Sequence, residues 1–207
     1  AFFDKLSASQ KASIKAVCID RNGAYRSAIE EQLPEADIVF DRFHLMANLA
    51  KAIDQLRREE IKAASEEDKR VIKGQRYNLL RNPENLTGKQ SLCLRNLLAM
   101  NEKLSTAYIL KGQFRLTWTY STPGWARRFL KDWVVLVRES GIDPLVRFAN
   151  GVERDIEGIV SWCRHHLSNG LIESFNSTIS RIIFKARGIR SLDYLYLKLR
   201  QESLLQI

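Results

Sequence analysis

A short apolar run near the N-terminus restricts the fold of this chain more than any other feature. Residues 14–19 are mostly apolar, end at Asp20 and lead into turn-forming residues, which is typical of a buried strand. A segment with helical spacing follows until Pro34 stops it, and residues 37–41 then repeat the pattern of a short strand. Strand, helix and strand in this order predict a parallel α/β unit.

Amphipathic helices are predicted for most of the remaining chain. Apolar residues recur every three or four positions from Leu45 to Leu56, which indicates one long helix that ends near Ala64. Residues 65–90 are charged and interrupted by glycine and proline, so we expect an irregular segment there. Further helices are expected at about residues 90–110, 124–139, 144–166 and 171–187, with a last one after Ser191. The chain is therefore expected to be an α/β protein in which helix predominates.

Carboxylates and their neighbours are the candidates for chemistry. Asp20 lies at the tip of the first predicted strand, and Asp41 and His44 lie where the second strand gives way to a helix. Glu173 and Asn176 are three residues apart and therefore share one helical face. Acids on a strand tip and on a helix can converge on divalent metal ions, which suit phosphate-ester chemistry. From spacing alone, the simpler interpretation is that the aspartates cap helices and that Glu173 is solvated.

A longer pattern surrounds these residues at both ends of the chain. Its N-terminal part consists of Ala16-Val17-Cys18-Ile19-Asp20-Arg21-Asn22-Gly23-Ala24-Tyr25, Leu33-Pro34-Glu35-Ala36-Asp37-Ile38-Val39-Phe40-Asp41-Arg42-Phe43-His44, and Ala52-Ile53-Asp54 with Arg57-Arg58. Its C-terminal part consists of Ser168-Asn169-Gly170, Glu173, Asn176, Ile179-Ser180-Arg181, Ala186-Arg187-Gly188 and Tyr194. In this order the motifs resemble bacterial insertion-sequence transposases of the DDE type, in a group with Asp-x-x-His after the second acid. Residues 65–160 carry no diagnostic motif.

The resemblance implies an RNase H-like fold in which three acids bind divalent metal. It assigns Asp20 as the second acid and Glu173 as the last, both as catalytic metal ligands. Asp41, His44 and Asn176 would have supporting roles beside them. The implied cofactor is Mg²⁺ or Mn²⁺, with two ions in the complete enzyme.

The resemblance also implies how the chain is divided. Residues 1–64 would form the first part of the catalytic core, residues 65–160 a large helical insertion, and residues 161–207 the C-terminal helices that complete a partial RNase H-like fold. The family's first acid lies upstream of a Phe-Phe-x-x-Leu helix, which is Phe2-Phe3-Asp4-Lys5-Leu6 here. We therefore expect a C-terminal fragment that lacks the first acid and a DNA-recognition region, and that does not cleave DNA by itself.

The function that the resemblance implies is DNA transposition. Such an enzyme hydrolyses a phosphodiester at the transposon end and then transfers the freed 3′-hydroxyl to target DNA, as a homo-oligomer in its active complex. The alternative is a non-catalytic helical DNA-binding or assembly module from a decayed element, which the missing first acid favours. A helical RNA-binding protein is a third possibility.

Charge and aromatic residues favour a nucleic-acid partner. The net charge is +9, and two basic zones, residues 111–147 and 161–207, flank a short acidic one. Trp118 is our candidate for holding an unpaired base, with a core position as the alternative; Trp125, Phe129 and Trp133 have helical spacing and are expected in the core. The predicted DNA-contacting cations are Arg115, Arg127, Arg128, Arg181, Lys185, Arg187 and Arg190. For the last four, which lie near Glu173, a solvated helix face is the alternative.

No apolar stretch approaches the roughly 20 residues that a membrane span needs, and the chain starts without a basic and apolar leader. The three cysteines are far apart and form no Cys-x-x-Cys pair, which argues against disulfides and a cysteine zinc site. We expect a soluble cytoplasmic protein.

Overall fold

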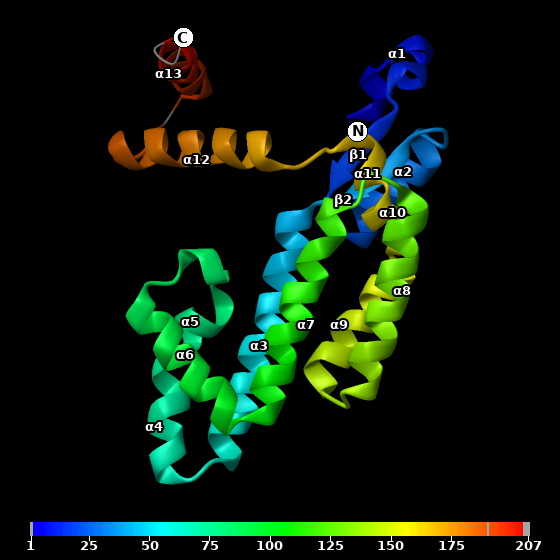
Figure 1. Ribbon diagram of the computed structural model, residues 1–207. Coiled ribbons are helices and arrows are strands. Elements are labelled where there is room, and N and C mark those ends of the chain that lie inside the picture. Colours follow the sequence, from blue (N-terminus) through cyan, green and yellow to red (C-terminus); the bar gives the residue numbers. More distant parts are fainter. Residues whose placement is uncertain (1, 190, 205–207) are drawn as a thin grey trace. The chain divides into compact units, whose positions relative to one another are not determined.

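The computed structural model describes residues 2–189 and 191–204. They form two compact units, Ala1–Leu167 and Ser168–Ile207, and their elements are labelled in Figure 1. The first unit contains both strands and most of the helices, and the second contains α12 (Gly170–Lys185) and α13 (Leu192–Leu204). The expected α/β class with predominant helix is confirmed, whereas the RNase H-like detail and the three-part division stay predictions.

The predicted strand–helix–strand unit is present. Strands β1 (Ala16–Ile19) and β2 (Asp37–Phe40) pair in parallel, and α2 (Gly23–Gln32) connects them. The register places Ile19 opposite Phe40, so both strands end at the same edge. Asn22 caps α2 by accepting a hydrogen bond from the Ala24 amide at 2.9 Å. The 3₁₀-helix η1 (Phe3–Lys5) and α1 (Ala8–Ser13) precede β1.

Helix α3 (Arg42–Ala63) is the long helix that the sequence predicts, with Leu45, Leu49, Ile53 and Leu56 buried on one face. The expectation of an irregular segment over residues 65–90 is wrong, because it contains α4 (Glu66–Gly74), α5 (Arg76–Leu80) and η2 (Pro83–Asn85). Glycine and proline stand at the ends of these helices, where they are compatible with helix. Ser65 accepts from the Asp68 amide at 3.2 Å and so begins α4.

Two predicted helices are divided in the structure. Residues 90–110 span α6 (Gly88–Met100) and α7 (Glu102–Arg115), because Asn101 caps α7 by accepting from the Leu104 amide at 2.8 Å. Residues 144–166 span α9 (Asp143–Arg154), α10 (Ile156–Val160) and α11 (Trp162–His165), with breaks at Asp155 and Ser161. The 3₁₀-helix η3 (Leu116–Thr119) and α8 (Pro123–Glu139) lie between them.

The core of the first unit lies between α3, α7, α8 and α9, which run side by side (Figure 1). Phe114, Trp133 and Phe148 form its aromatic centre, and the indole of Trp133 donates to the Leu110 carbonyl at 2.9 Å. Trp133 is a core residue as expected, but the expectation for Trp125 is wrong because its side chain is 61% exposed. Helix α8 buries Ala126 and Leu130 instead. None of the helices in the described part of the chain combines the length and apolar character needed to cross a membrane.

Candidate functional site

The ends of the two strands bring Asp20, Asp41 and His44 together. Asp20 follows β1 and Asp41 follows β2, and the Asp41 amide donates to the Ile19 carbonyl at 3.0 Å. Asp41 is only 1% exposed and caps α3 by accepting from the His44 amide at 3.1 Å. His44 therefore lies in the first turn of α3 and reaches back over the strand ends.

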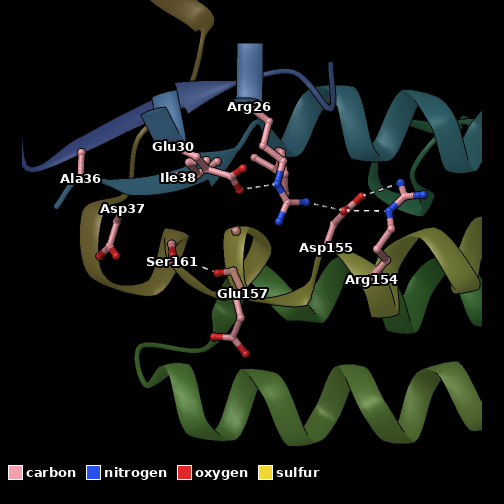
Figure 2. Close-up of a pocket in the computed structure, with 11 residues that line it drawn as sticks. Arg26, Glu30, Ala36, Asp37, Ile38, Arg154, Asp155, Glu157 and Ser161 are labelled. Carbon is pink, nitrogen blue, oxygen red and sulfur yellow. Dashed lines mark hydrogen bonds and ion pairs between the residues drawn. The ribbon is translucent and has the colours of Figure 1, made fainter. Parts of the chain in front are cut away.

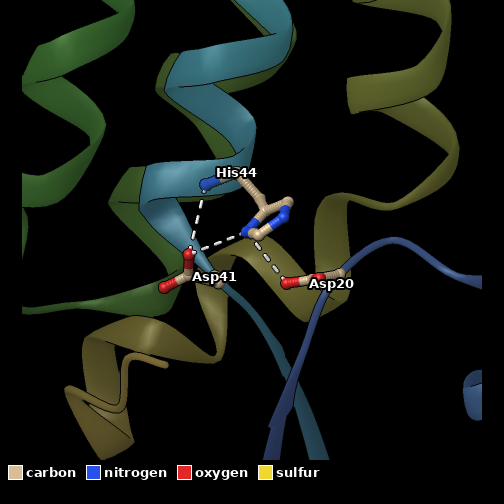
Figure 3. A group of neighbouring side chains, drawn as sticks. All are labelled: Asp20, Asp41 and His44. Atoms are coloured by element: carbon tan, nitrogen blue, oxygen red, sulfur yellow. Dashed lines mark hydrogen bonds and ion pairs between the residues drawn. The ribbon is translucent and has the colours of Figure 1, made fainter. Parts of the chain in front are cut away.

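The His44 imidazole lies between the two carboxylates (Figure 3). Its Nδ1 atom is 2.9 Å from Asp20 Oδ1 and 3.3 Å from Asp41 Oδ2. One donor atom from each residue lies within 4.8 Å of the others, a spacing that a single cation can bridge. Carboxylate oxygens suit Mg²⁺ and Mn²⁺, whereas an imidazole is more typical of ions such as Zn²⁺. The two carboxylates therefore fit the divalent ion that the motifs imply, with His44 as their hydrogen-bonding neighbour.

Negative charge at this edge affects the neighbouring thiol. Burial, together with the negative charges of Asp41 and Asp20, raises the pKa of Cys18 to about 12. Cys18 is on β1, two residues before Asp20, and the two carboxylates at the strand ends contribute to this shift after burial. A potential that disfavours a thiolate favours a cation at the same place.

A buried ion-pair cluster holds the loop that carries Asp20. Arg21 Nε donates to Asp155 Oδ2 at 2.6 Å, and Arg26 and Arg154 also reach Asp155, from opposite sides (Figure 2). Although burial raises the pKa of the Asp155 carboxyl, hydrogen bonds from Arg154 and Arg21 hold that pKa below its usual value. Asp155, which lies at the break between α9 and α10, thus anchors Arg21, the residue that follows Asp20.

Two glycines allow α9 and α10 to approach the strand unit this closely. A Cβ atom on Gly158 would lie 2.5 Å from the Phe40 ring, and one on Gly151 would overlap the Arg21 guanidinium. The position of Gly158 therefore favours glycine because of a close approach, whereas at Gly151 the end of the Arg21 side chain would have to move. No local sequence pattern predicts this anchoring, because Arg21 and Asp155 are 134 residues apart.

Glu173 and Asn176 both lie on α12, in the second unit, and both are exposed. Glu173 is in the first turn of α12, and its amide donates to the Asn169 carbonyl at 2.9 Å. The spacing of three residues places the two side chains on one face, as expected. The approach of Glu173 to Asp20 is a relation between the two units and stays a prediction.

Trp118 is half-buried and packs edge-on against Phe114 and Trp162, at ring-centre distances of 6.3 and 5.7 Å. Its indole Nε1 atom is buried without a hydrogen-bond partner among the described residues. Trp118 also lines a cavity of about 510 Å³ together with Phe43 and Arg115. It is therefore placed where it can both support the core and contact a ligand in the cavity.

The predicted DNA-contacting cations lie in different settings. Arg115 pairs with Glu84 at 2.6 Å, Arg127 pairs with Glu157 at 2.6 Å, and the Arg128 guanidinium lies 6.0 Å from the centre of the Trp125 ring. On the second unit Arg181 and Lys185 are exposed on α12, and Arg187 follows it with a φ of 50°. Arg190 lies outside the described residues. Their contact with DNA stays a prediction.

Comparisons with known proteins agree with the motifs. A family model described as "Transposase" matches residues 1–199. The transposase for insertion sequence element IS1001 of Bordetella parapertussis is 36% identical over 203 residues, which cover 97% of this chain and 50% of that protein. The transposase for insertion sequence element IS1557 of Mycobacterium tuberculosis, strain H37Rv, is 30% identical over 213 residues, which cover 92% of this chain and 48% of that protein. The chain therefore spans about half the length of the curated relatives it matches. No solved structure gives a significant match.

Proposed function

This chain belongs to the family of insertion-sequence transposases, and we propose that it carries part of the metal-dependent centre of a DDE-type enzyme. The observation that carries the proposal is the convergence of Asp20, Asp41 and His44 at the ends of β1 and β2. The reaction is hydrolysis of a phosphodiester at the transposon end, followed by transfer of the freed 3′-hydroxyl to target DNA. The active complex is a homo-oligomer on DNA.

The acids have two roles in this proposal. Asp20 and Glu173 hold Mg²⁺ or Mn²⁺, together with the first acid of the DDE set. When bound, two such ions activate a water or a hydroxyl and stabilise the leaving oxygen. Asp20 is suited to its role because the Arg21–Asp155 pair fixes the loop that carries it.

Asp41 and His44 position Asp20. Asp41 is buried and caps α3, so it fixes the start of the helix on which His44 lies. A proton on His44 Nδ1 can be donated to Asp20 Oδ1 at 2.9 Å, which orients the carboxylate toward the metal. The α12 residue Asn176 stands beside Glu173 in the equivalent supporting position.

DNA binds through cations and one aromatic side chain. Trp118 holds an unpaired base, and Arg115, Arg127, Arg128, Arg181, Lys185, Arg187 and Arg190 contact phosphates. The net charge of +9 supports this proposal, because counterion release favours binding of a cationic protein to DNA.

The roles of Asp20 and His44 can be separated by substitution. We expect Asp20→Asn to weaken Mn²⁺ binding by about tenfold or more, since it removes a ligand charge, and His44→Ala to leave it nearly unchanged. In a protein extended upstream to include the first acid, His44→Ala should lower cleavage by about 10–100-fold, the usual effect of losing an outer partner. Mn²⁺ titration calorimetry and cleavage of a labelled DNA duplex measure the two effects.

His165→Ala is the matched control, because His165 also pairs with an aspartate, Asp37, but at the start of β2. It should change neither Mn²⁺ affinity nor cleavage. A loss of Mn²⁺ affinity in His44→Ala equal to that in Asp20→Asn would make His44 a metal ligand. Unchanged Mn²⁺ binding in Asp20→Asn would contradict the proposed centre.

A further inference from the structure

A positively charged groove runs along α3, on the side that faces α5 and the end of α7. It consists of two adjoining cavities of about 510 and 580 Å³, which share Ala47, Ala50 and Leu80 in their walls. Small residues on α3 therefore leave room between the helices. The cationic side chains that line the groove are Arg42, Lys51, Arg58, Arg76, Lys111 and Arg115.

One end of the groove is built around Asp54, which is only 4% exposed. Arg58 NH2 donates to Asp54 Oδ2 at 2.6 Å, and Arg76 Nε donates to Oδ1 at 3.2 Å. Arg57 donates to the same carboxylate at 2.9 Å. Burial raises the pKa of Asp54, but hydrogen bonds from Arg57 and Arg58 hold it below its usual value, so the carboxylate keeps its charge.

This cluster has more positive than negative charge. Three guanidinium groups surround one carboxylate, and the side chains of Arg58 and Arg76 are 67% and 45% exposed. Each guanidinium has five N–H donors, so both have donors left for an anion in the groove. Because Asp54 already holds Arg58 and Arg76 in place, their remaining N–H donors are oriented before an anion binds.

The other end of the groove begins beside the candidate metal centre. Arg42 and Phe43 line it, and they lie between Asp41 and His44 in the sequence. The Arg42 guanidinium lies 5.0 Å from the centre of the exposed Phe43 ring. Trp118 adds a second aromatic side chain to this end. Cationic and aromatic groups together suit phosphates and bases better than they suit an acidic peptide.

Lys111 has a different role, although it lines the groove. It is 3% exposed, and its Nζ atom donates to the carbonyls of Leu79 and Arg81, each at 2.7 Å. These carbonyls lie at the end of α5, so Lys111 ties α5 to α7 and holds the groove wall. The cations that remain available to a ligand are therefore the arginines and Lys51.

We infer that this groove holds the sugar–phosphate backbone of a DNA strand and leads it to the Asp20–Asp41–His44 centre. The part of this inference that leads the strand to the Asp20–Asp41–His44 centre rests on the proposed function. From residue 42 to residue 58 the groove follows α3 for about 24 Å, at 1.5 Å per residue. That length corresponds to about seven phosphates of one strand at 3.4 Å each. Contacts to phosphates carry no sequence information, so binding here is independent of sequence.

The test compares the double variant Arg58→Gln/Arg76→Gln with the unchanged chain, on single-stranded and duplex DNA of 20 nucleotides. The plot of log affinity against log salt has a negative slope, and losing two phosphate contacts should make it less steep by about 1.4–1.8, which is roughly a 30-fold loss of affinity near 0.1 M salt. The matched control is Arg70→Gln/Arg95→Gln, which removes the same charge from exposed positions outside the groove. Its slope should not change. Fluorescence anisotropy measures both.

Lys51→Gln provides a second probe, because Lys51 is exposed on the groove and its replacement leaves the Asp54 cluster intact. It should make the salt dependence of DNA affinity less steep by about 0.7–0.9.

Three outcomes would each overturn the inference. They are equal losses of affinity in the groove and control variants, no DNA binding by the chain, and tenfold tighter binding of RNA of the same sequence. Unchanged Mn²⁺ binding in Asp20→Asn would contradict the proposed function, whereas groove variants without effect on DNA binding would contradict only the inference.

Discussion

Replacing Glu173 by Gln in a protein extended to include the first acid is expected to lower DNA cleavage by more than about 100-fold. The substitution removes a metal-binding charge at almost constant volume, and even an outer partner of a metal site contributes 10–100-fold. Fold and DNA affinity should stay unchanged, because Glu173 is exposed on α12. Single-turnover cleavage of a labelled transposon-end duplex with Mg²⁺ measures the loss.

Asp193→Asn is the control for this experiment. Asp193 is also an exposed acid in the first turn of a helix of the second unit, on α13. Its replacement removes the same charge and should leave cleavage unchanged. Cleavage by Glu173→Gln within about tenfold of the unchanged enzyme would mean that another residue supplies the last acid, since a metal ligand has a larger effect.

Asp155→Ala is expected to lower the free energy of unfolding by about 3–5 kcal/mol, because it leaves the buried end of Arg21 without its counter-charge. Urea denaturation measures this difference. Glu157→Ala is the matched control: its carboxylate also pairs with an arginine, but its side chain is 70% exposed, so its loss should cost less than about 1 kcal/mol. A cost for Asp155→Ala no larger than that of the control would contradict the anchoring role.

The contribution of Asp155 to the free energy of unfolding should decrease as the pH falls. Its pKa is lowered in the folded protein, so its contribution is complete above the unfolded pKa of about 3.9 and is lost as the pH falls through the folded pKa. The difference in unfolding free energy between the unchanged chain and Asp155→Ala should therefore shrink below about pH 4. A difference that grows in acid would have the wrong sign.

Local patterns allowed much of this fold to be predicted. The strand ends at Asp20 and Asp41 follow from short apolar runs with turn residues after them, and parallel pairing then places both acids at one edge. The breaks at Asn101 and Asp155 were missed because apolar periodicity continues across them. At Asn101 the capping side chain decides where the new helix begins.

Interactions between distant segments could not be predicted in this way. The pairing of Arg21 with Asp155, and of Arg76 with Asp54, depends on how helices pack and leaves no periodic signal in the sequence. The position of Trp125 could not be predicted from its helical spacing either. A residue at the border of an apolar face can be buried or exposed, and Trp125 is exposed. That Glu173 and Asp20 share a metal centre stays a prediction from the motifs that resemble the transposases.

The central claim is that Asp20 and Glu173 share one metal centre. A crystal structure of the extended protein with Mn²⁺, in which anomalous scattering locates the ions, tests it most directly. We expect both carboxylates to coordinate Mn²⁺, with two ions about 3.5–4 Å apart. An ion held by Asp20, Asp41 and His44 while Glu173 faces away from it would contradict the claim.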